Sequence, residues 1–301
     1  MKKTLMILAA ICMTMAANAK ILRVSNISGS SAPYTTIEDA HNAASSGDTI
    51  MLDASPNYYG DRYSNYQITK KVVIIGPGYW LVRNGIMAEG ANWAHVNTLT
   101  IKTGGVVVKG LYLNDIQIQA PHVVVNRCIL GGLTFGNEAD NGVVTQCYIT
   151  NTVNGANHIL LTNNIFTNTT KYSFFEDFNN STIAYNTFRN KNVQFSSSVH
   201  NCTIEHNLWK ACTNGGSGNS FNENYQTDII NTLATDDFND TDYYNLEIPA
   251  DVTCQYGAFA GDSPYVISGI PYGPYITDVG MATTVEEGST PTVTVKVNIS
   301  K

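Results

Sequence analysis

The sequence has little charge. Charged residues make up 14% of its 301 residues, and the formal net charge is −7. Proteins that bind nucleic acid usually carry a basic patch, which this composition does not supply. Disordered chains are typically highly charged and poor in aromatic residues, whereas this chain is 10% aromatic. We therefore expect a folded protein of one large domain or two small ones that binds no nucleic acid.

Long apolar runs are also missing, apart from one at the start. The stretch "MKKTLMILAAICMTMAANAK" (1–20) opens with Lys2 and Lys3, continues with a short apolar run and reaches "ANA" at 17–19. This order is typical of a secretory signal peptide, and the apolar run is too short to span a bilayer. We predict a signal peptide over residues 1–19, no membrane span, and a secreted protein located in the periplasm, at the cell surface or outside the cell.

Cysteine is scarce and unpatterned. Five cysteines follow the predicted signal peptide, an odd number whose spacing indicates neither a disulfide framework nor a zinc site. They are Cys128, Cys147, Cys202, Cys212 and Cys254. The disulfide state of the last three stays open at this point.

What the sequence does contain is a short repeat. Six segments align without gaps: "VVVKGLYL" (106–113), "VVVNRCIL" (123–130), "VVTQCYI" (143–149), "LLTNNIF" (160–166), "TIAYNTF" (182–188) and "TIEHNLW" (203–209). The first aligned column is aliphatic: Val108, Val125, Val144, Leu161, Ile183 and Ile204. The second is Leu111, Cys128, Cys147, Asn164, Asn186 and Asn207. The third is Leu113, Leu130, Ile149, Phe166, Phe188 and Trp209.

A repeat of this length indicates a solenoid. Successive segments are 17, 19, 17, 22 and 21 residues apart, whereas helical repeats need about 33 residues or more. Leucine-rich repeats need leucines at fixed steps, which are absent. Unrelated strands in a β-sandwich would not align in three columns. The pattern therefore predicts a parallel β-helix, whose coils stack at about 4.8 Å. The second column then places asparagines inward at a corner, where stacked amides bond to one another.

The flanking segments predict covers for the solenoid, which must shield its open ends. Residues 20–55 contain a strand and then a short helix, capped by Thr35 or Thr36 and ended by Gly47. We expect the apolar stripe of this helix to comprise Ile37, Ala40, Ala43 and Ala44. The coils should fill residues 56–232, and residues 233–301 should form a transition and a C-terminal tail.

Two of these segments resemble a known family. "TTIEDAHNAASSGDTIML" (35–52) and "KKVVIIGPGYW" (70–80) are similar to the N-terminal cap and first coils of secreted bacterial, pectin-lyase-like proteins. The resemblance covers roughly residues 20–230, taken as one solenoid. It implies an all-β fold, a right-handed parallel β-helix with a short N-terminal capping helix and a C-terminal β tail. It also implies that "YGAFAGDSPYVISGIPYGPYI" (256–276) packs after the last coil.

Proteins of that family include lyases, hydrolases and non-catalytic binders, so the residues must decide between these functions. A lyase needs acidic calcium ligands and an Arg or Lys base, and a hydrolase needs paired carboxylates. The aligned coils predict an outward polar column of Arg127, Gln146, Asn163, Tyr185 and His206, with Glu205 as the one carboxylate beside it. We name these five residues as the predicted ligand-binding surface, and Arg127, Tyr185, Glu205 and His206 as the catalytic candidates.

One acidic stretch lies beyond the repeats. "TDDFNDTD" (235–242) contains Asp236, Asp237, Asp240 and Asp242, which are either a Ca²⁺ loop or a solvated acidic loop. No other cofactor is predicted. Because the coils show no strong catalytic signature, we predict non-catalytic binding of an extracellular polysaccharide, with a neutral or amine-bearing glycan favoured by the acidic net charge. The alternatives are a polysaccharide lyase or glycoside hydrolase, and a structural protein or adhesin.

Overall fold

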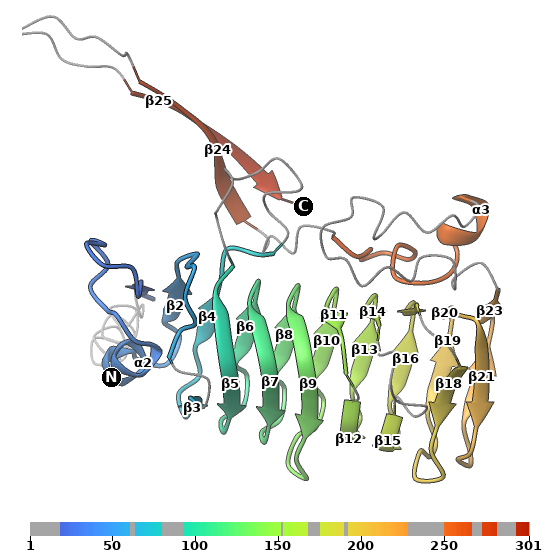
Figure 1. Cartoon of the computed structure of the whole chain (residues 1–301). Helices are drawn as coiled ribbons and strands as arrows, with labels where there is room; N and C mark the ends of the chain where they lie inside the picture. The colour runs from blue at the N-terminus through green and yellow to red at the C-terminus, as the bar shows by residue number, and fades with distance from the viewer. Residues whose placement is uncertain are drawn as a thin grey trace, which may run out of the picture.

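The chain folds as a parallel β-helix, as predicted (Figure 1). The computed structural model describes residues 19–60, 64–79, 93–151, 153–167, 175–189, 192–227, 250–266, 273–281 and 293–300. Residues 1–18 of the predicted signal peptide lie outside this part of the chain. Within it, no helix is long and apolar enough to cross a membrane.

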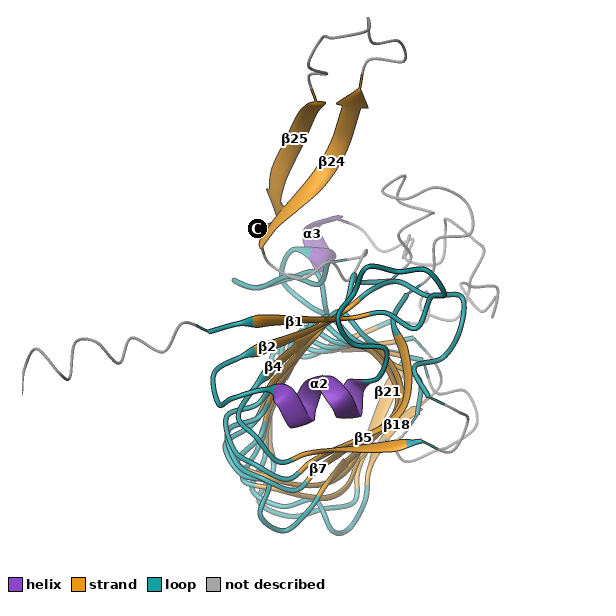
Figure 2. Cartoon of the chain, turned by 90° about the vertical axis from the view of Figure 1, so that its left-hand side faces the viewer, coloured by secondary structure: helices purple, strands orange, loops and turns teal. Residues whose placement is uncertain are grey.

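One wall of the solenoid, called sheet A here, contains one short strand from each coil. Its ten strands pair in parallel, in the order β1 (Ile21–Val24), β2 (Thr49–Leu52), β4 (Val73–Ile75), β6 (Val107–Lys109), β8 (Val124–Asn126), β10 (Val143–Thr145), β13 (Leu160–Thr162), β16 (Thr182–Ala184), β19 (Thr203–Glu205) and β22 (Ser220–Asn222). Figure 2 looks along the coils and shows the ring of strands around the core.

The remaining walls form sheet B, which bends around the core. Its early coils each contribute one strand: β3 (Asn65–Ile68), β5 (His95–Ile101), β7 (Tyr112–Ile118) and β9 (Ile129–Phe135). In later coils the bend divides this path into two strands. The pairs are β11 (Tyr148–Ile149) with β12 (Val153–Asn157), β14 (Ile165–Phe166) with β15 (Phe175–Asn179), β17 (Thr187–Phe188) with β18 (Asn192–Phe195), and β20 (Leu208–Trp209) with β21 (Ala211–Asn214). Strand β23 (Tyr225–Gln226) follows β20 in the sheet.

The three predicted columns are confirmed as stacks of buried side chains. Val125 pairs in register with Val108 on one side and with Val144 on the other. In the third column the rings of Phe166 and Phe188 stack with centroids 4.6 Å apart. Like residues therefore lie above like residues, because each coil repeats the path of the coil before it.

The second column forms the predicted amide ladder. Asn186 is fully buried, and its Oδ1 accepts from the backbone N–H of Asn164 (2.9 Å) and from Asn164 Nδ2 (3.0 Å). Asn186 Nδ2 in turn donates to Asn207 Oδ1 at 3.0 Å and to the Leu161 carbonyl at 2.9 Å. The ladder continues to Asn224, which the sequence alignment did not include. Each buried amide is satisfied by the neighbouring coils, which is the condition for burying it.

A short helix, α2 (Ile37–Ala43), covers the N-terminal end of the core (Figure 2). Thr36 caps it by accepting the N–H of Asp39 at 3.1 Å. Two details differ from the prediction. His41, not Ala43, lies on the buried side. The helix ends at Ala43 rather than near Gly47, because the next residue, Ala44, adopts an extended backbone. Lys70 donates to the carbonyls of His41 and Ala44 at this end.

The C-terminal region contains a short helix, α3 (Ala250–Thr253), and an antiparallel hairpin of β24 (Gly273–Met281) and β25 (Val293–Ser300). The hairpin is the predicted β tail. Residues 250–266, called the C-terminal strap here, do not continue the spiral beyond the last coil. They run back along one side of the solenoid (Figure 1), which corrects the arrangement implied by the resemblance.

The ladder yields a stability prediction. Asn186→Ala should lower the free energy of unfolding by about 3 kcal/mol, because it leaves buried donors and acceptors of two neighbouring coils unpaired. Urea unfolding would measure the change. Asn222→Ala, at an exposed position of β22, is the matched control and should change stability by less than about 0.5 kcal/mol. Equal effects of the two substitutions would contradict the ladder as a stabilising element.

Candidate functional site

The residues predicted to line an outward sheet face lie instead at the corners between sheets A and B. Arg127, Gln146, Asn163, Tyr185 and His206 all have positive φ, between 52° and 56°. A left-handed backbone is uncommon for residues other than glycine. Here it turns the chain from sheet A into sheet B just before each residue of the second column. The corner N–H donates to the next coil, as from Arg127 to the Thr145 carbonyl at 3.1 Å.

The C-terminal strap covers this column of corners. Asn163 Nδ2 donates to the carbonyls of Ala258 (3.1 Å) and Ala260 (2.7 Å). Gln146 Nε2 donates to the carbonyls of Ser263 (3.2 Å) and Pro264 (2.6 Å). The polar side chains that suggested a ligand surface thus bind backbone of the same chain.

The five corner residues differ in how far they are exposed. Arg127 is 0% exposed, Gln146 2% and Asn163 3%, and Arg127 Nε donates to Gln146 Oε1 at 2.9 Å. Tyr185 and His206 are partly exposed and stack on each other with centroids 4.7 Å apart. The expected exposed patch is therefore wrong for the first three residues, and a ligand could reach only the last two without moving the strap.

The strap also buries an outward apolar column that the sequence reading missed. Tyr112, Ile129, Tyr148 and Ile165 occupy the outward position of four successive coils, between the second and third inward columns. Thr187 takes this position in the next coil and Leu208 in the coil after it. An outward position of a solenoid wall facing water would normally be polar. The sequence does indicate this cover in the apolar triplets "CIL" (128–130) and "CYI" (147–149). A strand in which apolar and polar residues do not alternate is usually covered on both faces.

A pair of buried tyrosines fixes the far end of the strap. Tyr265 and Tyr79 place their hydroxyl oxygens 2.6 Å apart, and Tyr265 packs with Ile129 and Tyr148. Burial raises the pKa of both phenols well above the ordinary value. Both rings therefore stay neutral and act as packing groups that join the strap to the early coils.

The four catalytic candidates do not form one site. Arg127 and His206 are separated by four steps of the same column, which is roughly 19 Å at the ~4.8 Å spacing of neighbouring strands. Glu205 lies on the outer side of sheet A, in register with Asn222. His206 Nε2 lies 2.8 Å from an Oε atom of Glu223. An acid and a base must both reach one substrate bond, and of the four candidates only Tyr185 and His206 are in ring contact.

The predicted Ca²⁺ candidates Asp236, Asp237, Asp240 and Asp242 lie outside the described residues. Within the described ranges, no three His, Cys, Asp or Glu side chains gather as a set that could hold a metal ion. The five cysteines there are free thiols.

The apolar column continues past the strap as a stack of rings. His95 lies between Tyr58 and Tyr112, with centroids 3.7 Å and 4.0 Å away. His95 Nε2 contacts Asn114 Oδ1 at 2.9 Å, and Asn114 Nδ2 donates to Asn97 Oδ1 at 2.8 Å. Because an amide oxygen only accepts, Nε2 must carry a proton. Burial lowers the pKa of His95, so the ring stays neutral near neutral pH.

Around the bend from these rings lies an open polar cavity of about 520 Å³. It is formed by the ends of β9, β12 and β15, and its lining comprises Thr134, Phe135, Gly136, Asn137, Asn154, Gly155, Ala156, Asn157, Asp177 and Asn179. Gly155 and Asp177 both have positive φ, at 64° and 57°. The two residues interrupt the β12–β15 ladder at the same level, and both line the cavity. The sequence reading did not identify it, because its lining residues come from the ends of three strands that lie in different coils.

Comparisons with known proteins identify no relative of the chain. No protein-family model, no curated protein and no solved structure matches the chain.

Removing the ring of Tyr265 tests the role of the strap. Tyr265→Ala should lower the free energy of unfolding by about 3 kcal/mol, since a large buried aromatic side chain is lost. It should also raise the fluorescence of the dye ANS as the apolar column becomes exposed. Ser263→Ala keeps the backbone carbonyl that Gln146 binds, and it should change neither quantity. An unchanged Tyr265→Ala protein would show that the strap is not part of the stable fold.

The buried histidines predict a dependence of stability on pH. The pKa values of His41 and His95 are both lowered on folding, chiefly by burial. As the pH falls below about 6.5, the unfolded chain binds protons that the folded chain does not, so the free energy of unfolding decreases. Urea unfolding at pH 7.5 and pH 5.0 would show this fall, and His95→Gln should reduce it. The exposed His122→Gln is the control and should retain the wild-type fall.

Proposed function

We propose that this protein is an exported, pectin-lyase-like β-helix that binds a polysaccharide at the polar cavity formed by β9, β12 and β15. The proposal takes the fold from the structure, and it takes export and bacterial origin from the predicted signal peptide and the family resemblance. The cavity replaces the corner column as the leading binding surface, because the strap covers most of that column.

The observation that carries the proposal is a set of polar side chains without partners. The side chains of Thr134, Asn137, Asn154 and Asp177 make no hydrogen bond within the described part of the chain, and all four line the cavity. Asn154 Oδ1 is shielded from solvent and still unpaired. A shielded acceptor without a partner is unfavourable, and a ligand hydroxyl that donates to it would remove that penalty.

The charge of the cavity favours a neutral or amine-bearing glycan. Asp177 is the one ionisable side chain among its lining residues, and no Lys, Arg or His lines it. A polyuronate would bring carboxylates next to Asp177 without a cation to pair with them. Neutral hydroxyl groups, in contrast, suit the amide and hydroxyl side chains as both donors and acceptors.

The surface leading to the cavity repeats from coil to coil. Gln117, Thr134 and Asn154 occupy the same outward position on β7, β9 and β12. Their spacing follows the strand separation of about 4.8 Å. A polymer of identical units can contact such a row repeatedly, which favours an extended glycan over a single sugar.

Isothermal titration calorimetry against a soluble neutral β-glucan, chitosan oligomers and polygalacturonate tests the proposal. We expect binding to one of the first two and none to polygalacturonate. Asn154→Leu, combined with Thr134→Val, should weaken binding about tenfold or more, as expected for two or three lost hydrogen bonds.

The control is Thr213→Val, an exposed position of β21 away from the cavity, which should retain full affinity. Binding that the Asn154→Leu/Thr134→Val protein retains, or a failure of all three glycans, would contradict the proposed site. Reducing ends measured in the same samples report cleavage, and their appearance would favour the lyase or hydrolase alternative.

A further inference from the structure

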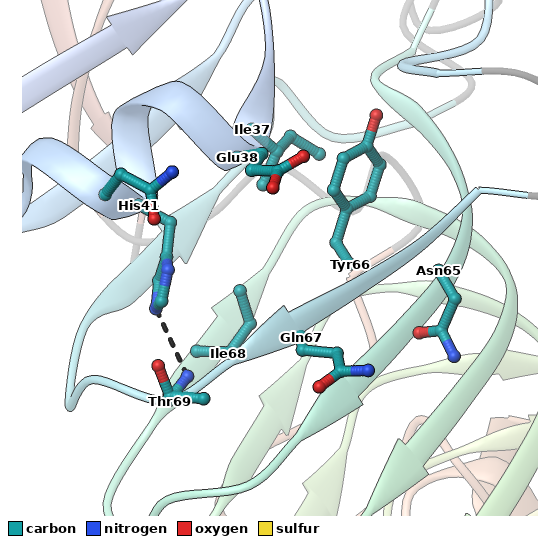
Figure 3. A pocket seen from close by; sticks show the side chains of 9 residues that line it. Ile37, Glu38, His41, Asn65, Tyr66, Gln67, Ile68 and Thr69 are labelled. Atoms are coloured by element: carbon teal, nitrogen blue, oxygen red, sulfur yellow. Dashed lines mark hydrogen bonds between the residues drawn. The ribbon is translucent and has the colours of Figure 1, made fainter.

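A second cavity lies at the N-terminal end of the solenoid, between helix α2 and strand β3 (Figure 3). Its volume is about 320 Å³. Its lining comprises Ile37, Glu38, His41 and Asn42 from the helix, and Asn65, Tyr66, Gln67, Ile68 and Thr69 from the strand and its end. It is separate from the glycan cavity, which lies on later coils.

Strand β3 is an edge strand of sheet B. It pairs only with β5 within the described residues. The N–H of Thr98 donates to the Ser64 carbonyl (3.2 Å), and the N–H of Lys102 donates to the Ile68 carbonyl (2.8 Å). Backbone groups alternate in direction along a strand. The N–H and C=O groups of Asn65, Gln67 and Thr69 therefore point away from β5.

His41 provides a hydrogen-bond partner for one of these outward backbone groups. The N–H of Thr69 donates to His41 Nε2 at 3.2 Å (Figure 3). Because this nitrogen accepts, the proton of the neutral ring lies on Nδ1. Burial, with a smaller effect of the Lys70 charge, lowers the pKa of His41 and favours that neutral form. One position of the edge is thus capped from α2.

The rest of the edge has no such cap. The backbone groups of Asn65 and Gln67 that point away from β5 have no partner in the described chain, and they border the cavity. An unpaired strand edge is a template for another strand. Extended peptides use such edges through main-chain hydrogen bonds, while a side-chain pocket gives specificity.

The chemistry of the cavity selects the side chain. Glu38 is exposed and has no ion pair within the described ranges. Tyr66 lines the same cavity and is partly exposed, whereas Ile37 and Ile68 are buried beneath it. A Lys or Arg side chain matches this arrangement, because its aliphatic stem can lie on the ring of Tyr66 while its charge reaches the carboxylate.

We propose that this cavity and the free edge of β3 bind an extended peptide segment of a partner protein, which adds as a strand to sheet B and places a Lys or Arg side chain against Glu38. The interaction is independent of glycan binding and uses a different surface.

Fluorescence anisotropy with three labelled peptides tests the proposal on the mature protein. The probe is acetyl-Thr-Val-Lys-Val-Thr-amide. The second peptide has Glu in place of Lys, and the third is N-methylated at alternate amides. We expect saturable binding of the probe and at least tenfold weaker binding of the other two. The proposal would be overturned if binding of the probe does not saturate up to millimolar protein concentration, or if all three peptides bind equally.

Two variants locate the site. Glu38→Gln should weaken probe binding severalfold, and Gln67→Pro should weaken it further, because proline removes an outward N–H from an edge strand, where proline is tolerated. The control Glu176→Gln, at an exposed position of β15, should bind as the wild type does. Circular dichroism confirms that each variant is folded.

Three results would assign the edge differently and overturn the proposal. One is unchanged probe binding by both variants. Another is displacement of the probe by the β-glucan or chitosan oligomers. The third is a concentration-dependent dimer in sedimentation that Gln67→Pro abolishes, since the occupant would then be a second copy of the chain.

Discussion

The amide ladder at the corners of the later coils, from Asn164 to Asn224, is the interaction on which the structure depends. Each corner residue adopts a left-handed backbone, which is unfavourable for side chains other than glycine. In the later coils the residue that follows the corner is an Asn, which binds both the backbone and the side chain of the neighbouring coil, as Asn186 does with Asn164 and Asn207. In the two coils before them this residue is Cys128 or Cys147, and the N–H of Cys147 donates to Asn164 Oδ1 at 2.9 Å. One coil therefore specifies the position of the next. Stacked side chains, parallel pairing and a closed core all follow from that repetition.

The turn at the ladder also directs apolar side chains outward, and the C-terminal strap covers them. A coil that turns sharply at the ladder presents its next residue outward, and in this chain that residue is often large and apolar, as at Ile129 and Tyr148. The strap packs on this column and binds Gln146 and Asn163 through its carbonyls. Along one side the protein therefore has two apolar layers, one inside the solenoid and one beneath the strap.

Binding chemistry is left to surfaces that neither the ladder nor the strap covers. The cavity beside Asn154 has unpaired amides and a single carboxylate, whereas the cavity beside Glu38 combines an open strand edge with an acidic rim. The first suits hydroxyl-rich ligands and the second suits a basic extended peptide. The two sites lie on different coils, so the fold can present both at once.

The solenoid could be predicted from the sequence because its stabilising contacts recur at a fixed spacing. The columns of Val108, Leu111 and Leu113 and their counterparts encode the same inward pattern about every 20 residues. The capping helix was also predictable, since Thr36 and the apolar positions Ile37 and Ala40 lie within one short segment. Its last turn was not, because Lys70, which binds the carbonyls at this end, comes from a distant part of the chain.

The sequence by itself determined the coil, its inward residues and its corner amides, since each follows from neighbours within one repeat. Only the tertiary structure decided which outward residues meet water. Gln146 and Asn163 read as a ligand surface because nothing in their own repeats indicates the strap, whose contacts lie 95 or more residues away. The polar cavity at Asn154 likewise depends on strand ends from three coils meeting in space, which no local spacing encodes.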